Sequence, residues 1–239
     1  MFSHKGKTRN EKHNLGIASL LGFVAGLVNV VGFFSVQKLT TNVTGHFAYF
    51  VDETFKQDFR AAFHVALYIF FFFLGAFISN FIVEIYSRKK ENLLYVIPAL
   101  AEAFILAAIG FSGNFLMAES PDLIAFGLLF AMGMQNSLVT SISHSVVRTT
   151  HLTGLFTDMG IEFSQLFFYK DQDHKKKLIN SIKLRFTIIG MFFAGGLVGG
   201  MLYESLGIKA LLLGTIILLC GLFFDFIKIK LLLLKRKSQ

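Results

Sequence analysis

The feature that most constrains this chain is a series of long apolar blocks that contain almost no charge. A helix needs about 20 mostly apolar residues to cross a bilayer core that is about 30 Å thick. Six segments approach or exceed that length: residues 15–37, 61–84, 93–112, 122–147, 184–205 and 207–229. The helices of a soluble bundle would carry a charged outer stripe, and these blocks carry none. We therefore predict an all-α polytopic membrane protein with six transmembrane helices.

The distribution of basic residues predicts the orientation. Of the 23 Lys and Arg residues, 19 lie in the two terminal regions, 1–14 and 228–239, and in the connections at 87–92 and 148–185. Cytoplasmic loops carry the excess of Lys and Arg, so we expect both termini, with basic tails at 1–14 and 231–239, on the cytoplasmic side of a bacterial inner membrane. The expected partner of these lysines is the lipid bilayer, through its anionic headgroups, and not a nucleic acid.

A polar phrase occurs twice in the sequence, about half the chain length apart. Residues 40–47 read TTNVTGHF, and residues 149–156 read TTHLTGLF. We call these the first and the second phrase. The apolar block before each phrase contains Gly-x-x-Asn, at 26–29 and at 133–136. Self-similarity of this kind indicates an internal duplication.

Each half of the chain has the same order of segments: a span, a phrase, a short broken helix, and two further spans. We place the halves at residues 15–112 and 113–230. Because three spans is an odd number, the second half must enter the membrane from the opposite face, and the halves become inverted repeats. Inverted repeats are common in transporters, in which interrupted helices form a site near the bilayer midplane.

The phrases suggest how such a site would be built. The hydroxyls of Thr44 and Thr153 could cap the start of a short helix by accepting from a free backbone N–H. Free N–H groups and the positive end of the helix dipole suit an anion or a carbonyl oxygen. The predicted substrate-binding residues are Asn29, Thr41, Thr44, Gly45, Gln135, Asn136, Thr150, Thr153 and Gly154.

Two alternatives stay open for these polar residues. Each phrase could merely cap an interfacial helix in a loop. Asn29 and Asn136 could form structural hydrogen bonds between helices, which average about 0.6 kcal/mol in one membrane protein.

Ionisable residues inside spans are functional candidates by default. Glu102 lies in the middle of an apolar block, and His151 and Asp158 lie in or just after the second phrase. We predict these three for proton or ion coupling. The alternatives are a protonated packing role for Glu102 and helix capping for Asp158. No H-E-x-x-H, G-x-S-x-G or P-loop motif occurs, so we expect no enzyme, no metal and no cofactor.

The sequence resembles a known family at several positions. GMQN at 133–136 and VRTTHLTG at 147–154 resemble the YoaK-type family of bacterial membrane proteins, which typically carries Gly-Met-Gln-Asn and Val-Arg-Thr-Thr-x-x-Thr-Gly. The chain departs from the family pattern at Gly26, where an acid is usual, and at Gly45-His46, where Gly-Asn is usual. The resemblance implies a six-span inner-membrane protein. It implies no substrate, because the family is labelled a domain of unknown function.

Two functional hypotheses follow. The first is a transporter or channel for a small solute that is anionic or carries an amide. The second is a non-transporting membrane scaffold or sensor. A cluster of glycines could serve a homodimer or only the seam between the halves: Gly195, Gly196, Gly199 and Gly200.

Overall fold

The computed structural model describes residues 11–87, 95–143 and 145–237. These residues contain helices and connections but no strand. In chain order the elements are α1 (Glu11–Val36), α2 (Thr44–Phe55), α3 (Phe59–Ser87), α4 (Val96–Glu119), α5 (Pro121–Ser143), α6 (Leu152–Phe168), α7 (Gln172–Leu206), the short 3-10 helix η3 (Gly207–Ala210) and α8 (Leu211–Lys237).

Five stretches of the described residues are long and apolar enough to cross a membrane: Lys12–Val36, Phe59–Tyr86, Val96–Glu119, Pro121–Ser143 and Gln172–Ile227. The prediction of an all-α membrane protein is thus confirmed. The first four predicted spans correspond to four of these stretches, with shifted bounds. The predicted basic tail at 1–14 falls mainly on residues 1–10, outside the described part of the chain.

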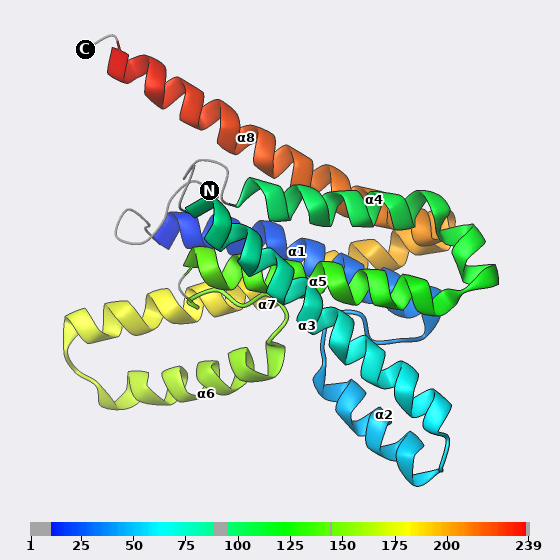
Figure 1. The fold of residues 1–239 in the computed structure, drawn as a ribbon. Coiled ribbons are helices and arrows are strands. Elements are labelled where there is room, and N and C mark those ends of the chain that lie inside the picture. Colours follow the sequence, from blue (N-terminus) through cyan, green and yellow to red (C-terminus); the bar gives the residue numbers. More distant parts are fainter. Residues whose placement is uncertain (1–10, 88–94, 144, 238–239) are drawn as a thin grey trace.

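The last stretch contains both of the remaining predicted spans. It is 56 residues long and includes α7, η3 and most of α8. A straight helix of that length would measure about 84 Å, far more than the bilayer core. The chain instead turns at η3, where Gly207 has a φ of 57°, and α8 runs back past α4 (Figure 1).

In Figure 1 the long helices lie roughly along one axis, with α3 inclined to the others. Successive long helices run in opposite directions, so the connections alternate between the two ends. α1 and α5 lie at the centre, and most of their apolar side chains belong to one continuous buried core. α3 is peripheral and exposes a row of aromatic side chains, among them Phe73, Phe77 and Phe81. An apolar exposed row of this kind fits contact with lipid.

Close backbone packing joins α1 to α7. A methyl group on Gly26 of α1 would overlap the carbonyl oxygen of Phe192 in α7. Reciprocally, a methyl group on Gly195 of α7 would overlap the carbonyl oxygen of Phe23 in α1. Small residues at these positions let two helix backbones approach closely, which is how helices associate where lipid removes the hydrophobic driving force.

The same arrangement joins α3 to α5. A methyl group on Gly75 of α3 would overlap the carbonyl oxygen of Phe130, and one on Gly133 of α5 would overlap that of Phe72. Gly133 stands in the second Gly-x-x-Asn as Gly26 does in the first. The first long helix of each half therefore packs on the helix that follows the short helix of the other half.

The structure contradicts the predicted capping role of Thr44 and Thr153. α2 begins at Thr44 itself, and the residue at its N-cap position is Val43, whose side chain caps nothing. α6 begins one residue before Thr153, with His151 at the N-cap position and no side-chain cap bond. An N-cap residue must precede the first helical residue, and both threonines lie inside their helices.

A pair of substitutions in α7 tests the close packing. Gly195→Ala should lower the midpoint of thermal unfolding in detergent, because the added methyl group meets the α1 backbone, and overpacking of this kind typically costs about 1–3 kcal/mol. Gly190→Ala in the same helix adds its methyl group to open space and should leave the midpoint unchanged or slightly higher. Equal effects of the two substitutions would contradict the packing described here.

Candidate functional site

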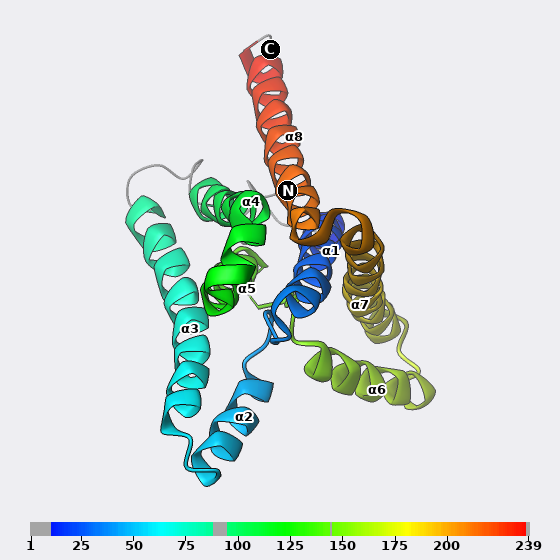
Figure 2. The ribbon, with the colours of Figure 1, turned by 90° about the vertical axis from the view of Figure 1, so that its right-hand side faces the viewer.

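The two short helices start near each other and run apart. In both views of the ribbon, α2 and α6 begin close to the middle of the molecule (Figure 1, Figure 2). In Figure 1, α2 then runs to the right-hand end, and α6 runs to the left-hand end. α2 packs on α3, and α6 packs on α7. The phrases therefore place two helix amino-termini near each other on one side of the long helices (Figure 2), where the side chains of Thr44 and Thr153 are exposed.

Hydrogen bonds fasten the first phrase to α1. The hydroxyl of Thr41 donates to the side-chain oxygen of Asn29 over 2.7 Å. The hydroxyl of buried Thr40 donates to the carbonyl oxygen of Val28 over 3.3 Å. The first Gly-x-x-Asn and the first phrase thus form one unit, which we call the first tether.

A matching set of bonds fastens the second phrase to α5. The hydroxyl of Thr150 donates to the side-chain oxygen of Asn136 over 2.9 Å. The side-chain nitrogen of Gln135 donates to the hydroxyl oxygen of Thr149 over 3.1 Å and to the carbonyl oxygen of Leu21 over 2.9 Å. This second tether therefore also reaches α1 of the other half.

Two polar atoms of the second tether are buried without a hydrogen-bond partner among the described residues. They are the side-chain oxygen of Gln135 and the side-chain nitrogen of Asn136. Buried polar groups in proteins normally have a partner. An acceptor and a donor at neighbouring positions are therefore left for a ligand or for water.

The other predicted binding residues lie outside the tethers. The side chains of Thr44 and Thr153 are exposed. Gly45 accommodates the side chain of Leu39, and Gly154 accommodates the ring of His151, because a methyl group on either glycine would overlap them. The structure thus brings Asn29 together with Thr41, and Gln135 and Asn136 together with Thr150.

Glu102, one of the predicted coupling residues, is fully buried in α4. Neither of its carboxyl oxygens has a hydrogen-bond partner among the described residues. Next to it, the backbone oxygen of Ala103 accepts a bond from the hydroxyl of Thr215 in α8, over 3.3 Å. This bond holds the α4 backbone next to Glu102 against α8.

Asp158 takes part in an ion-pair cluster between α6 and α7, whereas His151 is exposed at the start of α6. The guanidinium of Arg185 donates to both carboxylate oxygens of Glu162, over 2.9 and 3.0 Å. It also donates to Asp158 over 2.7 Å. The hydroxyl of Ser181 donates to Glu162 over 2.6 Å. Asp158 and Glu162 lie four residues apart on one face of α6, and together they hold Arg185, with a bidentate contact from Glu162.

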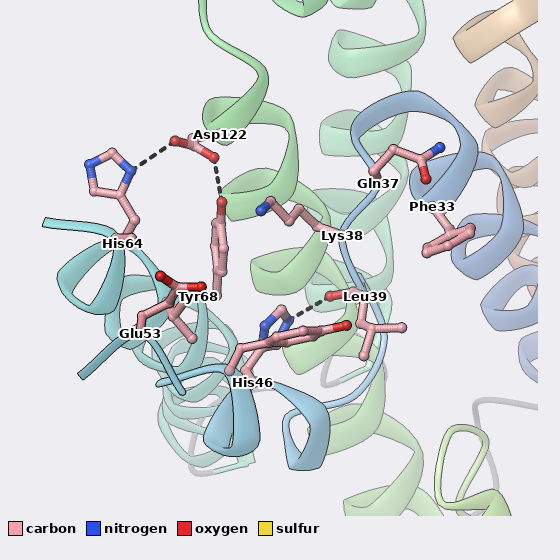
Figure 3. Close-up of a pocket in the computed structure, with 12 residues that line it drawn as sticks. Phe33, Gln37, Lys38, Leu39, His46, Glu53, His64, Tyr68 and Asp122 are labelled. Carbon is pink, nitrogen blue, oxygen red and sulfur yellow. Dashed lines mark hydrogen bonds and ion pairs between the residues drawn. The ribbon is translucent and has the colours of Figure 1, made fainter. Parts of the chain in front are cut away.

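A pocket of about 270 Å³ opens between the end of α1, the first phrase, α2 and the beginnings of α3 and α5. We call it the α2–α3 pocket (Figure 3). Its ionisable lining residues are Lys38, His46, Tyr49, Glu53, His64, Tyr68 and Asp122. None of them belongs to the predicted substrate-binding or coupling set.

A hydrogen-bonded triad occupies one wall of the pocket. His64 Nδ1 lies 2.9 Å from one carboxylate oxygen of Asp122, and the hydroxyl of Tyr68 donates to the other. His64 and Tyr68 are four residues apart and share one face of α3, a spacing that the sequence does reveal. Their partner Asp122 comes from the first turn of α5, and no local pattern predicts that encounter.

His46 of α2 also lines the pocket and is almost fully buried. Its Nε2 bonds the carbonyl oxygen of Leu39 over 2.7 Å. Burial is the main reason that the pKa of His46 falls below its ordinary value near 6.5, and the charge of Lys38 adds to the effect. His46 is therefore neutral at physiological pH. Among the described residues, no group of three His, Cys, Asp or Glu side chains is placed to hold a metal ion.

The chain belongs to the family described as "Protein of unknown function (DUF1275)", which matches residues 17–224. This confirms the resemblance found in the sequence. No curated protein and no solved structure matches the chain.

A double-mutant cycle tests the second tether. Asn136→Leu and Thr150→Val should each destabilise the protein, and their effects should not add, because they remove one shared bond worth roughly 0.6 kcal/mol. The measurement is thermal unfolding in detergent. Thr157→Val is the control, because that exposed hydroxyl bonds only to its own helix. Additive effects at Asn136 and Thr150 would show that the bond contributes nothing.

His46 should make the stability depend on pH. The unfolded chain binds a proton near pH 6.5, whereas the folded chain resists protonation until a lower pH, so the unfolded state binds more protons in between. Stability should be fully present above pH 6.5 and fall as the pH drops towards the lowered folded-state pKa. His46→Gln should flatten this loss, and His151→Gln, at an exposed site, should not. A stability profile unchanged by His46→Gln would contradict this assignment.

Proposed function

We propose that this protein is a transporter or channel for a small solute in the bacterial inner membrane. The observation that carries the proposal is the placement of α2 and α6, which begin near each other on one side of the long helices and run apart towards opposite ends (Figure 1, Figure 2). Interrupted helices of this kind are tolerated at membrane depth only where they are buried in protein or line a wet cavity.

We further propose six crossings that form two inverted three-helix repeats. Counting α7 and α8 as separate crossings gives an odd number of spans to each half. The contacts support the symmetry, because Gly26 and Gly195 correspond to Gly133 and Gly75 in the crossed packing of the halves. The two tethers correspond in the same way. With the basic tails in the cytoplasm, the α2–α3 pocket would open towards the outside.

The proposed solute-binding residues are those of the tethers and of the helix starts. The uncommitted atoms of Gln135 and Asn136 offer one acceptor and one donor, and the amino-termini of α2 and α6 offer free N–H groups. A solute with a carboxylate or an amide suits this set. Glu102, whose buried carboxyl oxygens bond to no described residue, is the proposed site of proton coupling.

The alternative function, a non-transporting scaffold or sensor, is favoured by a different observation. The side chains of Asn29 and Asn136 already bond inside their own halves. On that view, the phrases stabilise the fold and bind no solute. The proposal and this alternative differ in whether solute crosses the membrane.

Flux measurements separate the two functions. The full chain is reconstituted in liposomes, and the uptake of labelled anions, amino acids, sugars and nucleobases is compared with that of empty liposomes. Thr44→Val and Thr153→Val should reduce the flux about tenfold, equivalent to about 1.4 kcal/mol, at unchanged thermal stability, because their exposed hydroxyls lie outside the tethers. Thr157→Val is the control. Absence of flux across the panel would favour the scaffold, and flux that persists unchanged in both threonine variants would contradict the proposed role of the helix starts.

A further inference from the structure

We infer that the α2–α3 pocket is a binding site for a small zwitterion, with a cationic ammonium or guanidinium group at Glu53 and a carboxylate at Lys38. The inference names a ligand class for the mouth of the pathway and so rests on the proposed function. It is tested by binding alone, which keeps the two separable.

The second half of the chain shows what the pocket would hold. In that half, α6 and α7 are joined by a cation, because the guanidinium of Arg185 sits between Glu162 and Asp158. Glu162 is only 13% exposed, and the pair is bidentate. This geometry is the strong form of a carboxylate–cation contact.

The first half has the carboxylate, Glu53, but no cation from α3 that corresponds to Arg185 of α7. Glu53 follows Thr44 by nine positions, just as Glu162 follows Thr153 by nine. Val65 precedes Gly75 by ten positions, just as Arg185 precedes Gly195 by ten. Val65 and Glu53 both line the pocket. The place that the Arg185 side chain fills in one half is therefore open space beside an acid in the other.

The two acidic residues of the pocket differ in how many of their carboxylate oxygens already accept hydrogen bonds. Both carboxylate oxygens of Asp122 accept bonds from His64 and Tyr68. One carboxylate oxygen of Glu53 lies 3.1 Å from the ammonium nitrogen of Lys56, on its own helix, and the other bonds to none of the described residues. Glu53 is thus the acid that is free to accept from a ligand, as Glu162 accepts from Arg185.

A cationic side chain on the other side of the pocket completes the dipolar pattern. Figure 3 shows Lys38, which lies between α1 and the first phrase, reaching towards Tyr68 and Asp122, while Glu53 lies lower in the view. The preceding residue, Gln37, ends α1 in a left-handed turn with a φ of 54°, and its backbone N–H donates to the carbonyl oxygen of Phe33 over 2.8 Å. The ammonium group of Lys38 offers N–H donors for a carboxylate.

The size and walls of the pocket limit the ligand. A volume of about 270 Å³ lies just below the usual range for drug-sized ligands, about 300–1,000 Å³. Phe33 and Tyr49 add aromatic surface, which favours a cation near a ring face. An amino acid or a molecule of similar size fits these limits.

The binding test uses matched trios of probes. Purified full-length protein in detergent is titrated by calorimetry with the ω-amino acids from glycine to 6-aminohexanoate. Each is compared with the alkanoate and the alkylamine of equal chain length. At least one zwitterion should bind, with an affinity about tenfold or more above both of its partners. No binding by any zwitterion, or equal binding by an alkanoate or an alkylamine, would overturn the inference.

Single substitutions locate the two ends of the ligand. Glu53→Gln and Lys38→Met should each weaken the best zwitterion at least about tenfold, because each removes a charged hydrogen-bond partner. The matched controls are Asp52→Asn, next to Glu53 on α2, and Lys209→Met in η3, neither of which lines the pocket. If the controls weaken binding as much as the test variants, the zwitterion binds elsewhere and the assignment fails.

One substitution imposes the arrangement of the second half on the first. Val65→Arg places a guanidinium opposite Glu53 and should abolish zwitterion binding, whereas Val65→Met, similar in length but uncharged, should retain binding within a few-fold. If Val65→Arg does not fold, the Glu53 and Lys38 variants decide the matter. Zwitterion binding without any flux would support this inference and contradict the proposed transport function. Flux without zwitterion binding would support transport and contradict this inference.

Discussion

The contact on which the rest of the structure depends is the approach of two pairs of helix backbones at glycine. Lipid supplies no hydrophobic force to press helices together, so van der Waals contact at close range must hold α1 to α7 and α3 to α5. At Gly26 and Gly195, and at the corresponding Gly75 and Gly133, no side chain larger than hydrogen fits. These contacts set the crossing of the two halves and hence the positions of the helices that carry the phrases.

The phrases depend on that frame in turn. Between a long helix and a short one, the backbone must leave the helical hydrogen-bond pattern, and its polar groups need partners where lipid offers none. Asn29 and Asn136 hold the threonines of the phrases against the central helices. The break between each long helix and the short helix that follows it is thus held by its own hydrogen bonds, and each short helix begins beside the bundle with an exposed threonine.

Sequence reasoning succeeded where a pattern is local or repeated, and it missed what depends on contacts between distant segments. The apolar blocks predicted the helices, and the repeat predicted two short helices after the phrases. The threonine caps were wrong by one or two positions, because helix starts are set by tertiary bonds such as those of Thr41 and Thr150. The triad of His64, Tyr68 and Asp122, and the clamp on Arg185, join residues that lie far apart in the chain.

The crossed arrangement of the halves also governs how the protein can be made. α1 finds its main partner in α7, and α3 finds its partner in α5, so neither early helix can complete its packing while the ribosome is still translating the first half. Their glycine faces must stay open, in the bilayer or against the insertion machinery, until the later helices arrive. The packing of α1 and α3 is therefore completed only after the later helices have entered the membrane. A fragment that ends after α4 lacks α5 and α7, the main packing partners of α3 and α1.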